Sequence, residues 1–193
     1  MQVPATLTPA QPLALVAAVE AAYLEQLGHP PQLCALALLC AQLALETANG
    51  AKIVANNPGN FKAGEGPDWC DFKTFEFVGT PPVKTVMACR FSAWPSLADG
   101  TSAWLRALYL RWPEAWSAAV RGDALGFAHG LKLRGYYTAP EADYAHGLAV
   151  WRDRYVDLLA GGPLPAARAD EAFPAPVGTE WEWVEPEVLP CAT

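Results

Sequence analysis

The sequence predicts a mainly α domain of the α+β class, in which several helices surround one buried helix and a single β-hairpin stands beside them. Residues 33–45 are apolar at every position except Gln42, which is typical of a helix buried on all sides. Other segments repeat apolar residues at helical spacing. Segments 70–78 and 83–91 are rich in Phe, Val and Thr and are separated by GTPP, a pattern typical of a hairpin.

The remaining helices follow from the same apolar periodicity. The first is predicted from Leu13 to its stop at Gly28, and Pro30 and Pro31 precede the buried helix, since proline is tolerated in a first helical turn. After the hairpin, helical patterns occupy residues 96–112, 113–120, 123–133 and 142–159.

Length and composition indicate one domain with an appendage. The chain has 193 residues, of which 52% are hydrophobic and 17% charged, as in globular proteins. We expect an N-terminal arm at residues 1–12, a folded domain at 13–160, and a linker and tail rich in Pro and acids at 161–193. Residues 179–184 alternate Glu with Trp and Val, like a strand laid on another surface, so we expect the tail to dock on a protein partner.

The distribution of charge weighs against anionic partners. The net charge is −7, but residues 1–168 carry 13 basic and 14 acidic side chains, and the other six acids lie in the tail. No basic stripe is present, so nucleic-acid binding is not predicted. The N-terminus lacks a signal-peptide pattern, and the buried helix is too short for a membrane span.

Cysteine and histidine usage predicts neither a metal site nor a cofactor. The five cysteines include no CxxC pair, and the three histidines form no HExxH motif, which disfavours a zinc peptidase. We interpret the cysteines as small buried apolar residues and take Cys70 and Cys89 as the candidate pair for a disulfide.

Glu46 is the candidate catalytic acid. It follows the apolar run and precedes the helix-stopping pair Asn49 and Gly50, although an acid is disfavoured near the negative end of a helix. Desolvation at such a rim raises the pKa of a carboxyl group. A carboxylic acid that is still protonated near neutral pH can serve as a general acid.

Four short motifs carry a resemblance to a known family. They are AQLALETANG (41–50), NNPGNFKA (56–63), CRFSAWPS (89–96) and LKLRGYYTAPEADYAHGL (131–148). In this order they resemble the bacterial glucosaminidases of the lysozyme-like superfamily, including flagellar-rod and autolysin enzymes that cut peptidoglycan. The resemblance covers about residues 33–159 and implies a lysozyme-like fold with a hairpin wing and no metal or cofactor. Its main departure is Asn49, where the family usually has Trp.

The resemblance also implies roles for individual residues. Glu46 matches the general acid, and Glu76 lies where the family carries a second acid on its hairpin. Tyr136 matches the tyrosine of a Gly-Tyr turn beside the catalytic cleft, where it is expected to orient a sugar or water in catalysis. The candidate substrate-binding residues are Asn57, Asn60, Lys62, Trp94 and Tyr137. Structural alternatives are that the asparagines hold their own turn and that Trp94, like Trp104, belongs to the core.

The function implied is cleavage of β-1,4 glycosidic bonds in the glycan strand of peptidoglycan, of the N-acetylglucosaminidase type. One alternative is a lytic transglycosylase, in which a single acid suffices because the sugar's own hydroxyl attacks. The other is a non-catalytic assembly component with a lysozyme-like fold. Without a recognisable signal, we expect synthesis in the cytoplasm and delivery to the wall by lysis, or by a phage or envelope machine.

Overall fold

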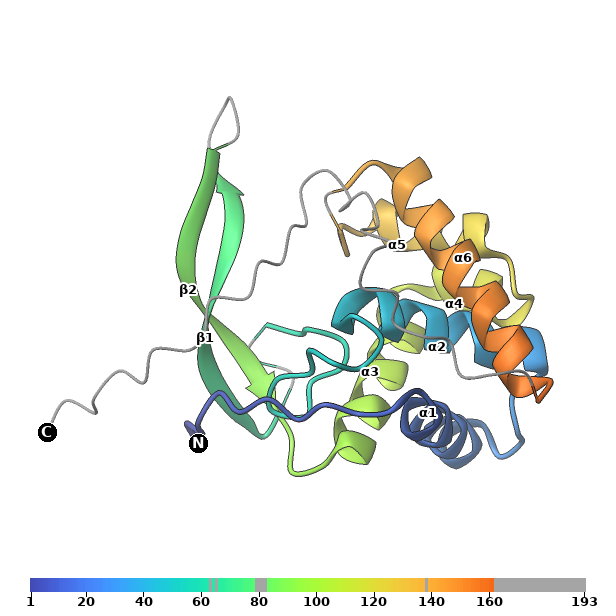
Figure 1. Ribbon diagram of the computed structural model, residues 1–193, viewed down its shortest axis with the longest axis horizontal. Helices are drawn as coiled ribbons and strands as arrows, with labels where there is room; N and C mark the ends of the chain where they lie inside the picture. Colours follow the sequence, from blue (N-terminus) through green and yellow to red (C-terminus); the bar gives the residue numbers. More distant parts are fainter. Residues whose placement is uncertain (63, 65, 79–82, 138, 162–193) are drawn as a thin grey trace, which may run out of the picture.

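The computed structural model describes residues 1–62, 64, 66–78, 83–137 and 139–161, with the backbone but not the side chains of residues 74–78, 83–85 and 87. Six helices and one two-stranded sheet form this part of the chain, which confirms a mainly α, lysozyme-like fold with a small hairpin (Figure 1). In chain order they are α1 (Pro12–Leu27), α2 (Leu33–Thr47), β1 (Asp68–Val78), β2 (Val83–Ala93), α3 (Leu97–Arg111), α4 (Pro113–Val120), α5 (Ala124–Leu133) and α6 (Glu141–Leu159).

Helix α2 is the centre of the core, as its apolar sequence predicts. Leu38, Leu39 and Leu43 have no exposed surface, and α1, α4 and α6 pack against this helix. Burying a side chain of this kind contributes about 1.5–3 kcal/mol. Because apolar residues cover the whole circumference of α2, its polar side chains near the C-terminus lie in protein surroundings rather than in water.

The loop after α2 turns sharply back on itself. Ala48 has φ 49° and caps the helix with its N–H on the carbonyl of Ala44, and Asn49, Ala55 and Asn56 also have positive φ. Left-handed backbone is costly for residues other than Gly. Contacts from elsewhere in the chain must therefore hold this loop in place.

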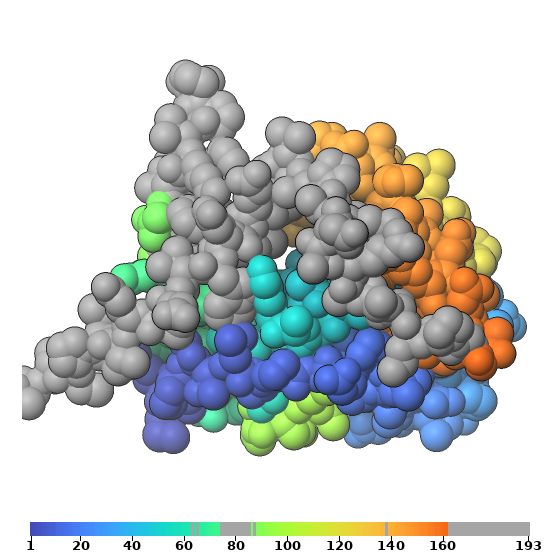
Figure 2. Space-filling view, viewed as in Figure 1, coloured from blue at the N-terminus to red at the C-terminus, as the bar shows by residue number. Residues whose placement is uncertain are grey.

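The N-terminal arm supplies part of that support. The N–H of Thr8 donates to the carbonyl of Ile53 at 2.8 Å, and the N–H of Ala55 donates to the carbonyl of Thr6 at 2.8 Å. Further along, the N–H of Val3 donates to Trp69 at 2.8 Å, and the arm lies along one face of the molecule (dark blue in Figure 2). Residues 1–11 are thus paired with the body, whereas the sequence predicted a lead-in arm outside the domain.

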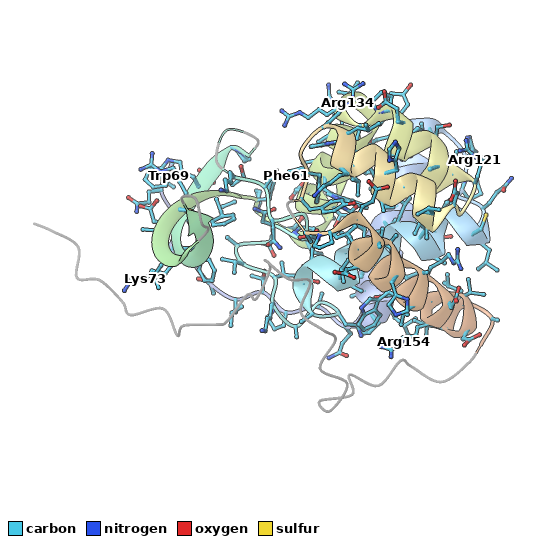
Figure 3. The ribbon with its side chains drawn as sticks, turned by 90° about the horizontal axis from the view of Figure 1, so that it is seen from above. Phe61, Trp69, Lys73, Arg121, Arg134 and Arg154 are labelled. Carbon is cyan, nitrogen blue, oxygen red and sulfur yellow. The ribbon has the colours of Figure 1, made fainter. Side chains whose placement is uncertain are left out.

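The hairpin is two residues longer at its base than predicted. Asp68 pairs with Ala93 and Val78 with Val83, and Cys70 packs against Val54 at the base. From there the hairpin projects away from the helices (Figure 1). Trp69 and Lys73 lie on it, Arg121 and Arg134 lie on the helical body, and Phe61 lies between these two parts (Figure 3).

The candidate disulfide is not formed. Cys70 is opposite Phe91 and Phe72 is opposite Cys89 in the register, so the two cysteines are diagonal neighbours and not a directly opposed pair. Both thiols are free.

Among the described residues, the model contains no helix with the length and apolar character needed to cross a membrane. The docking tail predicted at 161–193 lies outside these residues, apart from Gly161.

Candidate active site

Glu46 lies in the last turn of α2 and is partly buried. The Tyr144 hydroxyl donates to Glu46 Oε1 at 3.0 Å. Burial raises the pKa of Glu46 from 4.5 to about 7, while hydrogen bonds from Tyr144 and Asn60 act in the opposite direction. The rim position of this acid therefore has the effect expected from the sequence, because desolvation outweighs the hydrogen bonds that favour the charged form.

Tyr144 is a member of the site that sequence reasoning missed. It was assigned to the apolar face of the last helix, and it is indeed buried, but its hydroxyl reaches the acid. Burial and the neighbouring charge of Glu46 raise its pKa well above 10, so it remains a hydrogen-bond donor. Its place in the fourth motif, a few residues after the Gly-Tyr turn, is the one sequence signal that could have identified it.

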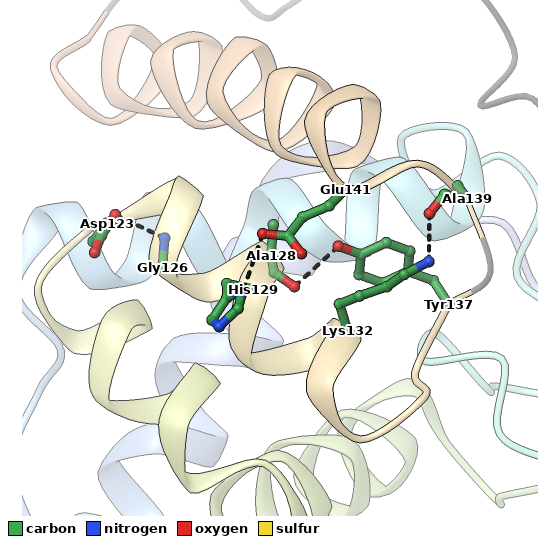
Figure 4. Close-up of polar contacts among 8 residues, drawn as sticks. All are labelled: Asp123, Gly126, Ala128, His129, Lys132, Tyr137, Ala139 and Glu141. Carbon is green, nitrogen blue, oxygen red and sulfur yellow. Dashed lines mark hydrogen bonds and ion pairs between the residues drawn. The ribbon is translucent and has the colours of Figure 1, made fainter.

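The ring of Tyr137 packs against the ring of Tyr144. The two rings stack with centroids 3.8 Å apart and planes 9° apart. The hydroxyl of Tyr137 donates to the Ala128 carbonyl at 3.0 Å, and Lys132 Nζ lies 4.9 Å from the ring centroid and donates to Ala139 (Figure 4). Because Tyr137 is buried among these partners, its geometry fits packing better than the substrate-binding role predicted for it.

Tyr136 also lies close enough to Glu46 to interact with its charge. Its hydroxyl donates to the Gly59 carbonyl at 3.2 Å, and its ring meets Trp112 edge-on at 5.2 Å. Burial, followed by the charge of Glu46, raises the pKa of Tyr136 well above 10. The turn before α6 and the loop after α2 thus converge beside the acid, although Tyr136 and Gly59 are 77 residues apart in the sequence.

The loop amides largely hold the backbone. Asn60 has φ 51° and donates from Nδ2 to the backbone carbonyl of Glu46 at 2.8 Å. Asn57 donates to the carbonyls of Phe61 and Ser92 at 2.9 and 3.0 Å, and its Oδ1 accepts from the Phe61 N–H. Asn57 is therefore a turn-holding residue in this structure, while Asn60 ties the loop directly to the end of the acid-bearing helix.

The remaining substrate-binding candidates are Lys62 and Trp94. Lys62 is exposed, and its carbonyl accepts from the Ser92 hydroxyl at 3.0 Å. Trp94 is buried and its ring centroid lies 6.5 Å from that of Phe61, while Trp104 is completely buried. Both tryptophans match the core interpretation that the sequence left open.

Asn49, the main departure from the family pattern, is also buried. Its Oδ1 accepts from the Tyr155 hydroxyl at 2.9 Å, which links the loop after α2 to helix α6. The position is therefore satisfied internally.

The backbone of Glu76 lies in β1 opposite Thr85, and its side chain lies outside the described residues. Within the described part of the chain, no group of three His, Cys, Asp or Glu side chains is placed to hold a metal ion.

No protein-family model matches the chain, and no curated protein sequence matches it either. Several solved structures, in contrast, do match this chain. A peptidoglycan hydrolase from Sphingomonas sp. A1 is 25% identical, with 78% of this chain and 92% of that chain covered and a TM-score of 0.54. The glycoside hydrolase domain of FlgJ from Salmonella typhimurium is 22% identical, with 79% and 92% covered and a TM-score of 0.51.

The catalytic domain of the autolysin Auto from Listeria monocytogenes is 19% identical, with 78% of this chain and 87% of that chain covered and a TM-score of 0.54. The motifs and these structures agree on one architecture. The chain therefore shares the lysozyme-like fold of known peptidoglycan hydrolases and glycoside hydrolase domains, which confirms at the level of fold the resemblance that its motifs predict.

Proposed function

We propose that this protein hydrolyses peptidoglycan, cleaving β-1,4 glycosidic bonds of the glycan strand as an N-acetylglucosaminidase, with Glu46 as the general acid. The proposal rests chiefly on one observation: a carboxyl group with a pKa of about 7 accepts a hydrogen bond from Tyr144 at the end of a buried helix. The similar structures support the substrate class, since two of them are peptidoglycan hydrolases or autolysins by name.

The chemistry required of Glu46 is proton donation to the leaving oxygen. An acid with a pKa of about 7 is protonated in about half of the molecules at pH 7, and it gives up its proton far more readily than an ordinary hydroxyl group does. General acids tuned in this way contribute roughly 100- to 10,000-fold in rate. The oxocarbenium-like transition state of glycoside cleavage needs such a donor on one side of the scissile bond.

The second acid in this proposal is Glu76. Alternate residues of a strand share a face, so position 76 has the parity of Cys70 and Phe72, and Cys70 packs against the body at the hairpin base. In hydrolysis the second carboxylate either activates water or attacks the sugar. Glu76→Gln should then slow hydrolysis severely, whereas full activity of this variant would remove Glu76 from the mechanism.

A lytic transglycosylase remains the second candidate. Among the side chains that the structure describes, no second carboxylate influences the pKa of Glu46. A single acid suffices for transglycosylation, because the sugar's own hydroxyl takes the place of water.

The products distinguish these reactions. Purified cell walls are incubated with the protein, and the soluble fragments are weighed by mass spectrometry. A hydrolase yields fragments that carry an added water at a reducing end, and the identity of the terminal sugar reports the bond that is cut. Anhydro-sugars would select the transglycosylase, and no fragments at all would select a non-catalytic assembly role.

The proposed place of action is the cell wall. Delivery by lysis, or by a phage or envelope machine, is part of this proposal, as is docking of the tail at 161–193 on a protein partner. Co-purification of the full chain, but not of a chain ending at Gly161, with components of such a machine would test both.

A further inference from the structure

Gln42 is a completely buried amide one helical turn before Glu46. Its side chain has no exposed surface, and neither Nε2 nor Oε1 has a hydrogen-bond partner among the described residues. Residues four apart on a helix lie on the same face, so Gln42 lies beneath the acid. Leaving a buried amide unpaired is costly, which calls for a compensating role.

The Gln42 amide lies beside the side chains of Tyr136 and Tyr144. The Gln42 side chain interacts with the hydroxyl groups of both Tyr136 and Tyr144 without a completed hydrogen bond, and it opposes the rise in the pKa of each phenol that burial causes. An amide does this through its N–H groups, of which a glutamine has two. Neither phenol needs Gln42 as an acceptor, because Tyr144 donates to Glu46 and Tyr136 donates to the Gly59 carbonyl.

We propose that Gln42 is a positioning residue for Glu46: its two amide N–H groups serve the oxygens of Tyr136 and Tyr144 and thereby keep the Tyr144 proton directed at the Glu46 carboxyl group. The inference deepens the proposed function and rests on it for the catalytic importance of Glu46. Each phenol then uses its proton on one partner and its oxygen on Gln42, and at Tyr136 the Trp104 side chain acts in the same direction as Gln42.

These linked hydrogen bonds are expected to lower the pKa of Glu46. An N–H group that donates to the Tyr144 oxygen polarises the phenol and makes it a better donor, since linked hydrogen bonds strengthen one another. A stronger donor stabilises the ionised form of Glu46 and lowers its pKa. Gln42 acts on both phenols without a completed hydrogen bond, so its effect is present in the protein without substrate.

Few other groups compete for this effect. The titratable groups that interact with Glu46 are Tyr144 on α6 and Tyr136 on the preceding turn, and Asn60 acts from the loop after α2. On α1, the carboxylate of Glu20 acts on the thiol of Cys40. No charged side chain of the described residues contributes to the pKa of Glu46.

The direct test is the proton affinity of Glu46 in Gln42→Met, which keeps nearly the same length and volume. The Glu46 carboxyl is titrated without substrate by carbon-13 NMR or by its infrared carbonyl band, and Glu46→Gln identifies the signal. We expect the pKa of Glu46 to rise by about half a unit to one unit, as loss of a hydrogen bond to the charged form requires. An unchanged pKa would overturn the proposal.

A double-mutant cycle separates positioning from packing. In a Tyr144→Phe background the relay is already broken, so Gln42→Met should then leave the pKa of Glu46 unchanged. Equal shifts in both backgrounds would show that Gln42 acts without Tyr144 and would contradict the proposal. Thr101→Val is the matched control, because Thr101 is also completely buried with an unpartnered hydroxyl, and it should not move the pKa.

A measurement on the unmodified side chain covers the case in which Gln42→Met does not fold. The side-chain N–H signals of Gln42 in the nitrogen-15 spectrum should shift with the pKa of Glu46, and this titration should vanish in Glu46→Gln. Signals insensitive to pH would contradict the proposal. Since no step uses substrate, an inactive protein with these signatures would refute the proposed function while leaving the role of Gln42 intact.

Discussion

At the scale of single residues, the site depends on the conflict between burial and charge at Glu46. Desolvation raises its pKa to about 7, and two hydrogen bonds limit that rise. Such a group is costly to keep ionised, so it destabilises the folded protein wherever the pH forces it to carry charge. The sequence allowed this acid to be predicted, because an acid after an apolar helical run is unusual. The partner Tyr144 could not be predicted, because helical periodicity identifies a core position and not the reach of a hydroxyl.

The cost of the buried charge predicts a pH-dependent gain in stability for Glu46→Gln. An unfolded-state pKa of 4.5 and a folded-state pKa of about 7 mean that the folded wild type binds more protons between these values. Its unfolding free energy then falls by about 1.4 kcal/mol for each unit of pH across that window, and by no more than about 3.5 kcal/mol in total. Urea unfolding should find the variant more stable than the wild type at pH 8 and equal to it near pH 4.

Glu114→Gln is the matched control for that measurement. The exposed Glu114 carboxylate pairs with Arg134 at 2.8 Å, and this partner lowers its pKa. The charged form therefore favours folding, so this variant should be less stable than the wild type at pH 8, and the difference should vanish at low pH. If Glu46→Gln behaved in the same way, the raised pKa of Glu46 would be contradicted.

At the scale of elements, the helices and the hairpin follow from sequence, but the loop after α2 does not. Helix α2 was predicted at 33–45 and runs over Leu33–Thr47, because apolar periodicity locates it. The loop is fixed instead by backbone bonds such as those between Thr8 and Ile53 or Ala55 and Thr6. These pairs are more than 40 residues apart and leave no side-chain pattern, so the sequence predicted a lead-in arm at residues 1–12 without its contacts.

The packing of α3 against this loop gives a prediction for Gly100→Ala. A Cβ at Gly100 would collide with the backbone carbonyl of Asn56 and lie 3.1 Å from Pro58, in the loop that carries Asn57 and Asn60. Overpacking of this kind costs about 1–3 kcal/mol, so we expect a lower unfolding free energy and lower activity together, measured by urea unfolding and fragment release.

Gly147→Ala is the control on helix α6. Its Cβ would meet only the flexible side chain of Leu45, at 3.2 Å, and alanine is favoured over glycine inside a helix by about 1 kcal/mol. This variant should be at least as stable as the wild type. Equal losses in both variants would mean that the close approach of α3 to the loop is not what Gly100 provides.

At the scale of the whole molecule, the catalytic unit and the tail are expected to be separable. Among the described residues, the core cluster extends from Leu15 to Leu158, so all the helices that carry Glu46 and Tyr144 belong to one core. The acidic residues beyond Arg168 account for six of the seven negative charges in excess. The body is then nearly neutral, which suits an approach to a polysaccharide, while the charge belongs to the tail.

Truncation at Gly161 tests this division. A chain of residues 1–161 should unfold at nearly the same urea concentration as the full chain and release soluble fragments at a similar rate, because the core cluster of the described residues runs from Leu15 to Leu158. Its association with a partner should weaken. Loss of folding on truncation would make residues 162–193 part of the catalytic domain instead.

The account depends most on Glu46 as the proton donor. The measurement that tests this most directly is the rate of fragment release from purified cell walls as a function of pH, for the wild type and for Glu46→Gln. We predict that the wild-type rate falls as the pH rises through about 7, since only the protonated acid can donate. The variant should retain less than about one hundredth of the rate with its fold intact by circular dichroism. More than about a tenth of the wild-type rate in Glu46→Gln would contradict the assignment.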